Sequence, residues 1–386
     1  MLLSLYNIYL EDFPRLGYTT IYNLYTKQLG CYTSTTIHDP MNSASYNSMM
    51  QKGFVINNQS DETNSVLEYY YQSVRNSNKV SFMLLLTNKC NCNCTYCYQS
   101  ENNNFADEFS VDLIIEFMNN QIKQLPDNCR IEIIFYGGEP LLKEEIISKI
   151  SLYMHSFYKD RFFFSIITNG TMLNPHLVST WSSLGLKVLK ITIDGCRESH
   201  NKRRKYMNGK PTYDDILTNL KAITGLCELR INTVIDNDVY GYEMLLDEIE
   251  SNGIHATYSI NITEPSDYSI SEKSNLYLKF ASEIKKRNLF QYVKLSATHG
   301  EICQAKICND YVIDGSGYIF PCNAIFRPIG NVQNYNIEKK QFVPIKEMCV
   351  NCKYLPICFG DCPYNTQCQK EYFEYFIPKI LKVYIR

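Results

Sequence analysis

The chain has 386 residues, of which 45% are hydrophobic and 20% are charged, and its formal net charge at pH 7 is −2. This composition is typical of a globular protein, and the length predicts two or three domains. A pI of about 6.3 argues against a nucleic-acid partner and against a polybasic membrane patch. Because the sequence shows neither a signal-peptide pattern nor an apolar run of about 18 residues, we expect a cytoplasmic protein without a membrane partner.

Residues 1–78 are expected to form a small separate unit. Alternating apolar side chains predict strands over residues 4–10 and 19–26, and a third short strand over 53–56. Apolar residues at helical spacing from Val66 to Val74 predict a final helix. Strands, short helices and a final helix would fit a winged-helix-like unit. The alternative is a packing cap that binds nothing.

Residues 79–290 show strands that alternate with helices, which predicts an α/β fold with a parallel sheet. Ser110 is expected to cap a helix whose apolar face includes Ile114, Phe117 and Met118. The expected strands cover residues 81–87, 131–136, 162–168, 187–193, 228–235 and 256–262. Six such units would make a partial (β/α)6 TIM-like barrel with its chemistry at the carboxyl ends of the strands.

Four short motifs directly follow these predicted strands. They are a cysteine-rich loop ending at Cys97, then GGEP (137–140), TNGT (168–171) and DG (194–195). Since the carboxyl ends of barrel strands meet at one rim, the four motifs are expected to share one site.

The cysteine-rich loop contains Cys90, Cys94 and Cys97 in C-x3-C-x2-C spacing. Three thiolates at this pitch can hold one cube of iron and sulfide, and they leave one metal position open. The alternative is a zinc knuckle with Cys92 as the fourth ligand.

The GGEP motif has a composition suited to ligand binding. Gly137 and Gly138 would let the backbone approach a ligand closely, and the carboxylate of Glu139 could accept an ammonium group. Alone, the motif would be no more than a turn after a strand. Its position one βα unit after the cysteine loop favours a shared site.

The chain has 16 cysteines, and half of them fall in residues 291–386, where the helix and strand periodicity fades. Eight thiolates would saturate two clusters, whereas zinc ions or disulfides are the alternative. These eight are Cys303, Cys308, Cys322, Cys349, Cys352, Cys358, Cys362 and Cys368. Four isolated cysteines, Cys31, Cys129, Cys196 and Cys227, are expected to be small buried hydrophobic residues.

Together, CNCNCTYCY, FYGGEPLL, ITNGT and ITIDG…H resemble the motifs of radical S-adenosylmethionine (SAM) enzymes. The resemblance implies that Cys90, Cys94 and Cys97 ligate a [4Fe–4S] cluster whose open iron binds SAM. An electron donor such as flavodoxin or ferredoxin would reduce the cluster, and a 5′-deoxyadenosyl radical would then abstract hydrogen from the substrate. Cys92 would be a bystander.

The resemblance also implies a set of SAM contacts. Gly137, Gly138 and Glu139 would hold the methionine amine, and Tyr96 or Tyr98 would lie near the adenine. The ribose and carboxylate would be bound by Asn169, Thr192 and Arg204.

The C-terminal cysteines resemble a SPASM domain with two auxiliary [4Fe–4S] clusters. The first auxiliary set would be Cys303, Cys308, Cys322 and Cys362, with Cys308 the least certain ligand because its spacing to Gly317 is short. The second auxiliary set would be Cys349, Cys352, Cys358 and Cys368.

The SPASM resemblance predicts a maturase for ribosomally made peptides that installs a thioether or carbon–carbon cross-link in a precursor peptide. Residues 1–78 would then pair an edge strand with an extended leader peptide. Anaerobic sulfatase maturation is the alternative, but those enzymes have an acid after the cysteine that matches Cys322, and this chain has Asn323. A cluster-bearing scaffold that binds peptides without catalysis is a third possibility.

Overall fold

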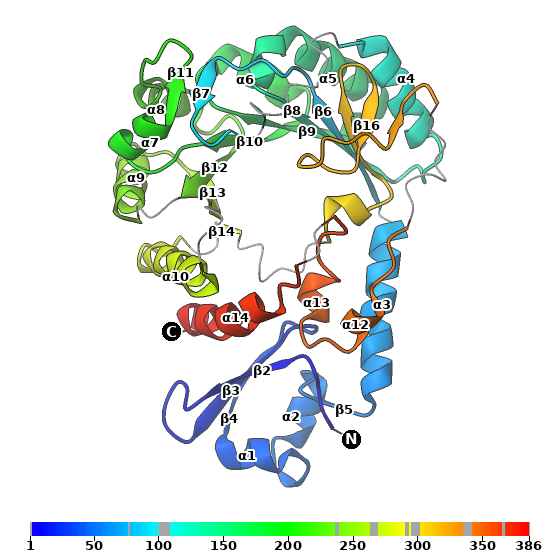
Figure 1. Ribbon diagram of the computed structural model, residues 1–386, viewed down its shortest axis with the longest axis vertical. Helices are drawn as coiled ribbons and strands as arrows, with labels where there is room; N and C mark the ends of the chain where they lie inside the picture. The colour runs from blue at the N-terminus through cyan, green and yellow to red at the C-terminus, as the bar shows by residue number, and fades with distance from the viewer. Residues whose placement is uncertain are drawn as a thin grey trace.

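The computed structural model describes residues 2–75, 78–97, 99, 109–235, 239–262, 269–289, 293–294, 302–334, 342–364 and 367–385. Figure 1 shows a small N-terminal unit at one end of the molecule and a curved sheet with its helices at the other. The C-terminal segment runs between them and ends in a helix beside the N-terminal unit.

The N-terminal unit contains a three-stranded antiparallel sheet in the order β2–β3–β4. Its bounds are β1 Leu2–Leu3, β2 Asn7–Glu11, β3 Tyr18–Asn23, β4 Leu29–Thr33, α1 Ser34–His38, α2 Tyr46–Gln51, β5 Val55–Ile56 and α3 Gln59–Arg75. As expected, Tyr6, Ile8 and Leu10 are buried on one face. The sequence prediction missed β4, which pairs with β3 from Leu29 to Thr33.

The six predicted barrel strands are present and form consecutive parallel pairs. They are β6 Lys79–Leu85, β8 Arg130–Tyr136, β9 Phe162–Thr168, β10 Leu186–Thr192, β12 Glu228–Ile235 and β13 Ala256–Ile262. The short strand β14 (Val293–Lys294) adds to β13, and it is the last described strand at that edge. The described strands therefore make a partial barrel.

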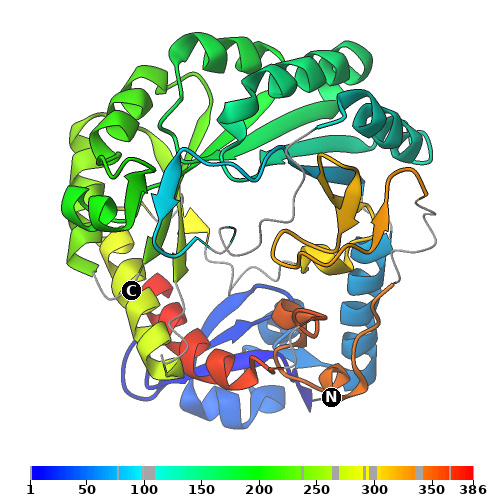
Figure 2. The ribbon, with the colours of Figure 1, turned by 45° about the horizontal axis from the view of Figure 1, so that its top comes forward.

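Helices cover the outer face of this sheet, as Figure 2 shows. They are α4 Val111–Ile122, α5 Glu144–Tyr158, α6 Pro175–Ser183, α7 Arg197–Arg203, α8 Tyr213–Ile223, α9 Val239–Ser251 and α10 Ile270–Lys286. Alternate strand residues such as Ile131, Ile133 and Phe135 are fully buried in the large core against these helices. The other alternate residues face the inside of the barrel.

The predicted cap of α4 is wrong in one respect. Ser110 stands at the N-cap position, but its side chain makes no capping hydrogen bond. Its backbone N–H instead donates to the carbonyl of Gly315, at 3.1 Å, and so ties the helix start to the C-terminal segment.

The C-terminal segment extends the barrel sheet, which the sequence prediction had not foreseen. Its first strand, β15 (Asp310–Asp314), pairs in parallel with β6, and β16 (Tyr318–Phe320) and β17 (Gly330–Asn331) follow in antiparallel order. The remaining elements are the short helices α12 (Glu347–Val350) and α13 (Leu355–Cys358) and the terminal α14 (Lys370–Ile385).

Helix α3 joins the N-terminal unit to the C-terminal segment (Figure 1). Tyr70 is fully buried, stacks on Phe359 with 5.7 Å between ring centroids, and donates its hydroxyl to the carbonyl of Val343 at 2.6 Å. Among the described residues, no helix is both long and apolar enough to cross a membrane.

Candidate functional site

The cysteine loop is anchored by a short strand that the sequence did not reveal. Strand β7 (Cys92–Cys94) pairs antiparallel with β11 (Arg204–Tyr206), so that Cys94 lies opposite Arg204. Two flanking hydrogen bonds extend the pairing, from Thr95 N to the Arg203 carbonyl at 3.0 Å and from Met207 N to the Asn91 carbonyl at 2.9 Å. The loop therefore has a fixed position relative to the end of β10.

The four cysteines of the loop differ in exposure. Cys92 is buried, as expected for a bystander, whereas Cys90, Cys94 and Cys97 are partly exposed. The prediction that the four isolated cysteines are buried is confirmed only for Cys129, because Cys196 and Cys227 are partly exposed and Cys31, on β4, is exposed.

The two glycines of GGEP pack closely against another segment of backbone, residues 87–89. The N–H groups of Gly138 and Glu139 donate to the carbonyls of Thr87 and Lys89, at 2.7 and 2.8 Å. A Cβ atom on Gly138 would lie 2.2 Å from the Lys89 carbonyl oxygen, and one on Gly137 would lie 2.5 Å from that of Thr87. Only glycine allows this turn to pack against the chain that leads into Cys90.

Glu139 links the GGEP turn to the TNGT turn through buried hydrogen bonds. Its carboxylate is fully buried and accepts hydrogen bonds from the Thr168 hydroxyl at 2.6 Å, from Asn169 N at 2.8 Å and from Leu141 N at 3.0 Å. Burial raises the pKa of Glu139 to about 7, although these three hydrogen bonds oppose the shift. Its predicted contact with an ammonium group stays a prediction.

An amide cluster links the cysteine loop to the TNGT turn. The side-chain amide of Asn169 donates to Asn91 Oδ1 at 2.7 Å, and that of Asn91 donates to Thr171 Oγ1 at 2.9 Å. Asn169 Nδ2 also lies 3.8 Å from the sulfur of Cys90. These contacts of Asn91 could not be predicted from the sequence.

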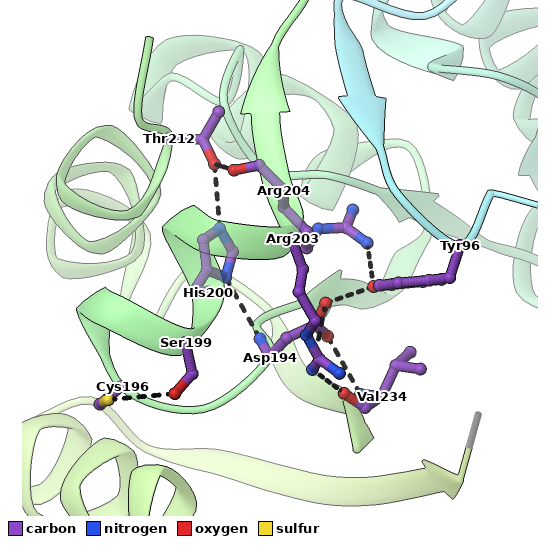
Figure 3. A network of polar contacts seen from close by, with 9 residues as sticks. All are labelled: Tyr96, Asp194, Cys196, Ser199, His200, Arg203, Arg204, Thr212 and Val234. Carbon is purple, nitrogen blue, oxygen red and sulfur yellow. Dashed lines mark hydrogen bonds and ion pairs between the residues drawn. The ribbon is translucent and has the colours of Figure 1, made fainter. Parts of the chain in front are cut away.

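Asp194, from the DG motif, is the centre of a buried polar network (Figure 3). Its carboxylate accepts hydrogen bonds from the Tyr96 hydroxyl and from Val234 N, and lies 3.7 Å from the guanidinium of Arg203. The Tyr96 oxygen accepts a hydrogen bond from Arg204 at 2.7 Å. Burial raises the pKa of Asp194, and the two arginines oppose that shift.

His200 extends this network from Asp194 to Thr212 (Figure 3). Its Nδ1 accepts the Asp194 N–H at 3.2 Å, so the proton of the neutral ring lies on Nε2, which is 2.9 Å from Thr212 Oγ1. Thr212 in turn donates to the Arg204 carbonyl at 2.9 Å. Burial lowers the pKa of His200 to about 3, with a further contribution from Arg204 and Arg203, so the ring stays neutral. The chain of contacts fixes Arg204 opposite Cys94.

A cavity of about 400 Å³ lies at the carboxyl ends of the strands, within the usual size range of small-molecule sites. Most of the predicted site residues line it: Cys90, Cys94, Tyr96, Cys97, Gly137, Gly138, Asn169, Thr192 and Arg204. Glu139 lies behind this wall, and Tyr98 is outside the described residues. The sequence did not point to Lys190, Asn232 and Asn261, which also line the cavity.

These residues fit the predicted cluster and SAM. Three partly exposed thiols border one cavity together with a glycine turn and polar side chains able to bind a small charged ligand. Within the described residues, no three Cys, His, Asp or Glu side chains are arranged around one point as a single-ion site would require.

The thiols of the first auxiliary set lie near one another, with Cys308 the open case. Burial raises the pKa of Cys303, and the neighbouring thiols of Cys362 and Cys322 add to the shift. Cys308 is held to α3 by a hydrogen bond from its N–H to the Val74 carbonyl, at 3.1 Å. Its predicted role as a ligand stays a prediction.

The thiols of the second auxiliary set form another group. Burial raises the pKa of Cys349, and the thiols of Cys352 and Cys368 add to this shift. Burial also raises the pKa of Cys358 to about 11, with a contribution from Cys349. The assignment of the eight C-terminal cysteines to two clusters stays a prediction.

Residues 84–267 match the family profile described as the Radical SAM superfamily. A relative from Methanocaldococcus jannaschii, an uncharacterized protein, is 35% identical over 40% of this chain, which spans about half of that relative (52%). A cysteine-type anaerobic sulfatase-maturating enzyme of Clostridium novyi is 24% identical over 73% of this chain and 87% of the relative. The radical SAM cyclopropyl synthase TigE of Paramaledivibacter caminithermalis is 22% identical over 82% and 75%, respectively.

Two groups of solved structures share the fold. The structure of anSMEcpe with bound AdoMet matches with a TM-score of 0.64 and 18% identity, over 79% of this chain and all of that one. Streptococcus suis SuiB bound to the precursor peptide SuiA matches with a TM-score of 0.56 and 14% identity, over 94% and 95%. The second match also spans the N-terminal part of this chain.

Proposed function

Since this chain contains a radical SAM domain and is an enzyme of that superfamily, we propose that it matures a ribosomally made precursor peptide. The proposed product is a peptide with a thioether or carbon–carbon cross-link. When bound, the cluster and SAM would supply the 5′-deoxyadenosyl radical that removes a hydrogen atom from the peptide. An acidic electron carrier such as flavodoxin or ferredoxin would deliver the electron in the cytoplasm.

The chain's own residues would divide this work. Cys90, Cys94 and Cys97 would hold the cluster, and the pairing of β7 with β11 would fix the loop that carries them. The backbone of Gly137 and Gly138 and the side chain of Asn169, which line the same cavity beside the cysteine loop, would bind SAM. Tyr96, Thr192 and Arg204 would complete its contacts.

One observation carries the choice of reaction. Asn323 and Ala324, from the segment that follows Cys322, line the same cavity as the first three cysteines. The C-terminal segment therefore closes the space in which a substrate would react. Among the described residues that line this cavity there is no aspartate or glutamate to serve as a base. A thioether bond would need no such carboxylate if an auxiliary cluster held the substrate thiolate.

The N-terminal unit supports a peptide substrate. Its sheet has β2 and β4 as edge strands, either of which could pair with an extended leader peptide. The similar structure of SuiB holds a precursor peptide, which favours this use of the fold.

The test combines anaerobic purification, SAM and dithionite with candidate precursor peptides, taken from short reading frames beside this gene. We expect 5′-deoxyadenosine and a peptide that has lost two hydrogen atoms, with a new cross-link in its fragmentation spectrum. The Cys90→Ala variant should give neither product. A peptide that is unchanged while 5′-deoxyadenosine accumulates would contradict this choice of substrate.

Sulfatase maturation is the second candidate, because the Clostridium novyi enzyme is similar over most of both chains. The same assay with a cysteine-containing sulfatase peptide tests it. Formation of formylglycine would establish the second candidate, and the cross-linking proposal would then fail. The non-catalytic scaffold is set aside because the chain is a radical SAM enzyme.

A further inference from the structure

The loop between Cys358 and Cys362 has an unusual backbone. Phe359, Gly360 and Asp361 have φ values of 49°, 78° and 54°, so three consecutive residues are left-handed. Non-glycine residues rarely adopt this region, and they persist there only where the surroundings hold them. Because Cys358 and Cys362 belong to different predicted auxiliary sets, this loop joins the two cluster sites.

Lys306 holds the loop from inside. Only 3% of its surface is exposed, and its Nζ donates a hydrogen bond to the carbonyl of Phe359 at 2.6 Å. The same nitrogen lies 5.7 Å from the centre of the Tyr70 ring, on which the ring of Phe359 stacks. Tyr70 belongs to α3, so the N-terminal unit completes the surroundings of this buried amine.

The amine is also close enough to thiols of both sets to interact with them electrostatically. Its partners are Cys303 of the first auxiliary set, Cys358 and Cys349 of the second, and the carboxylate of Asp361 in the loop itself. Gly360 keeps the space beside the amine open. A Cβ atom there would lie 3.7 Å from Lys306 Nζ and 3.9 Å from the sulfur of Cys349. The amine of Lys306 and the thiol of Cys349 therefore both lie next to Gly360.

We propose that Lys306 is a positioning residue that locks the loop from Cys358 to Cys362 between the two auxiliary clusters, and that its positive charge eases the reduction of both. A buried cation favours the more negative, reduced state of a nearby cluster, and net charge is one of the factors that set cluster potentials. The inference rests on the auxiliary clusters of the proposed function. It gives them a means to accept the electron that remains after bond formation.

The experiment uses the full chain with Cys90, Cys94 and Cys97 changed to alanine, so that only auxiliary clusters remain. Into this parent we would introduce Lys306→Met, and follow the reduced clusters by electron paramagnetic resonance during a potentiometric titration. We expect about eight irons per chain in both proteins. The reduced-to-oxidised ratio at a fixed potential should fall at least about tenfold in Lys306→Met, which is about 59 mV for a one-electron couple.

Two control variants test whether the effect comes from the buried charge of Lys306. Lys306→Arg keeps both the donor and the charge and should titrate like the parent. Lys346→Met removes an exposed lysine whose charge also acts on Cys349, and water should screen that loss. If Lys306→Met loses iron, Lys306→Gln, which retains a donor without a charge, takes its place in the titration.

The outcomes are distinct. About eight irons with an unshifted ratio in Lys306→Met or Lys306→Gln would overturn this inference and leave the auxiliary clusters intact. A parent that binds no iron would overturn the auxiliary clusters and this inference together.

Discussion

Single residues decide how the cysteine loop meets the barrel. Spacing and resemblance could single out Cys90, Cys94 and Cys97, because the three lie within eight consecutive residues, and all three line one cavity. Asp194 could not be assigned its role in this way. Its partners Tyr96, Arg203 and Val234 come from three separate segments, and only folding brings them together.

Glu139 gives the first prediction at this scale. In Glu139→Gln, one acceptor oxygen becomes an amide donor, which would face the N–H of Asn169 or the donors Thr168 and Leu141. A buried donor without an acceptor costs about 1–3 kcal/mol, so the thermal midpoint of the iron-free protein should fall. Glu145→Gln, at an exposed position on α5, serves as the control. Equal midpoints for both variants would refute the linking role of Glu139.

His200 gives a pH-dependent prediction. Its pKa is about 3 in the folded protein and near 6.5 when unfolded, so the unfolded state binds the extra proton first as pH falls. Stability from this residue is complete above pH 6.5 and is lost as pH falls toward 3. At pH 5 the loss is about 2 kcal/mol.

The check compares thermal midpoints of the iron-free protein at pH 7.5 and pH 5. His200→Gln retains a donor toward Thr212 but has no titrating ring, so its midpoint should fall less over this interval than that of the wild type. If the midpoint falls equally in the two proteins, His200 is not responsible for the loss of stability at pH 5.

At the scale of elements, long strands were predictable and short ones were not. The predicted bounds of β9, β12 and β13 agree with the structure, because an apolar residue recurs at nearly every second position in each. Strand β4 was missed because Gly30 interrupts its pattern, where a side chain would meet the rings of Tyr32 and Phe54. Strands β7 and β11 have three residues each and exist only as a pair from distant segments.

The contact between the GGEP turn and the cysteine loop can be tested by one methyl group. In Gly138→Ala the new Cβ would meet the carbonyls of Lys89 and Asn88, at 2.2 and 2.7 Å, so the chain before Cys90 must move. We expect iron to fall from about twelve to about eight per chain, because only the first cluster is lost. Gly253→Ala is the control, since a Cβ there meets no atom within 4 Å and the strain from its positive φ is confined to the turn between α9 and β13. Full iron content in Gly138→Ala would mean that the loop tolerates the displacement.

At the scale of the whole molecule, three parts surround and support one site. The division into three parts, taken from the change in sequence pattern, stays a prediction, and the role of α3 in packing against the C-terminal segment could not be predicted. That role depends on contacts between residues nearly 300 positions apart, such as the hydrogen bond from Tyr70 to Val343. The extension of the barrel by β15 was likewise outside local pattern analysis.

Tyr70 provides the prediction at this scale. Tyr70→Ala removes a fully buried ring, its stacking on Phe359 and its hydrogen bond to Val343, at a cost of about 3–5 kcal/mol. We expect the loss to be local and to release auxiliary iron, measured per chain after anaerobic purification. Phe157→Ala, which removes an exposed aromatic ring on α5, is the control and should retain its iron. Retention of all iron by Tyr70→Ala would show that α3 does not support the auxiliary sites.

The central claim is that three four-iron clusters are present and that the first loop holds the one that binds SAM. The most direct test measures iron, sulfide and zinc per chain in anaerobically purified protein, and in the variant with Cys90, Cys94 and Cys97 changed to alanine. We predict about twelve irons in the wild type and about eight in the variant. Stoichiometric zinc with little iron would contradict the account.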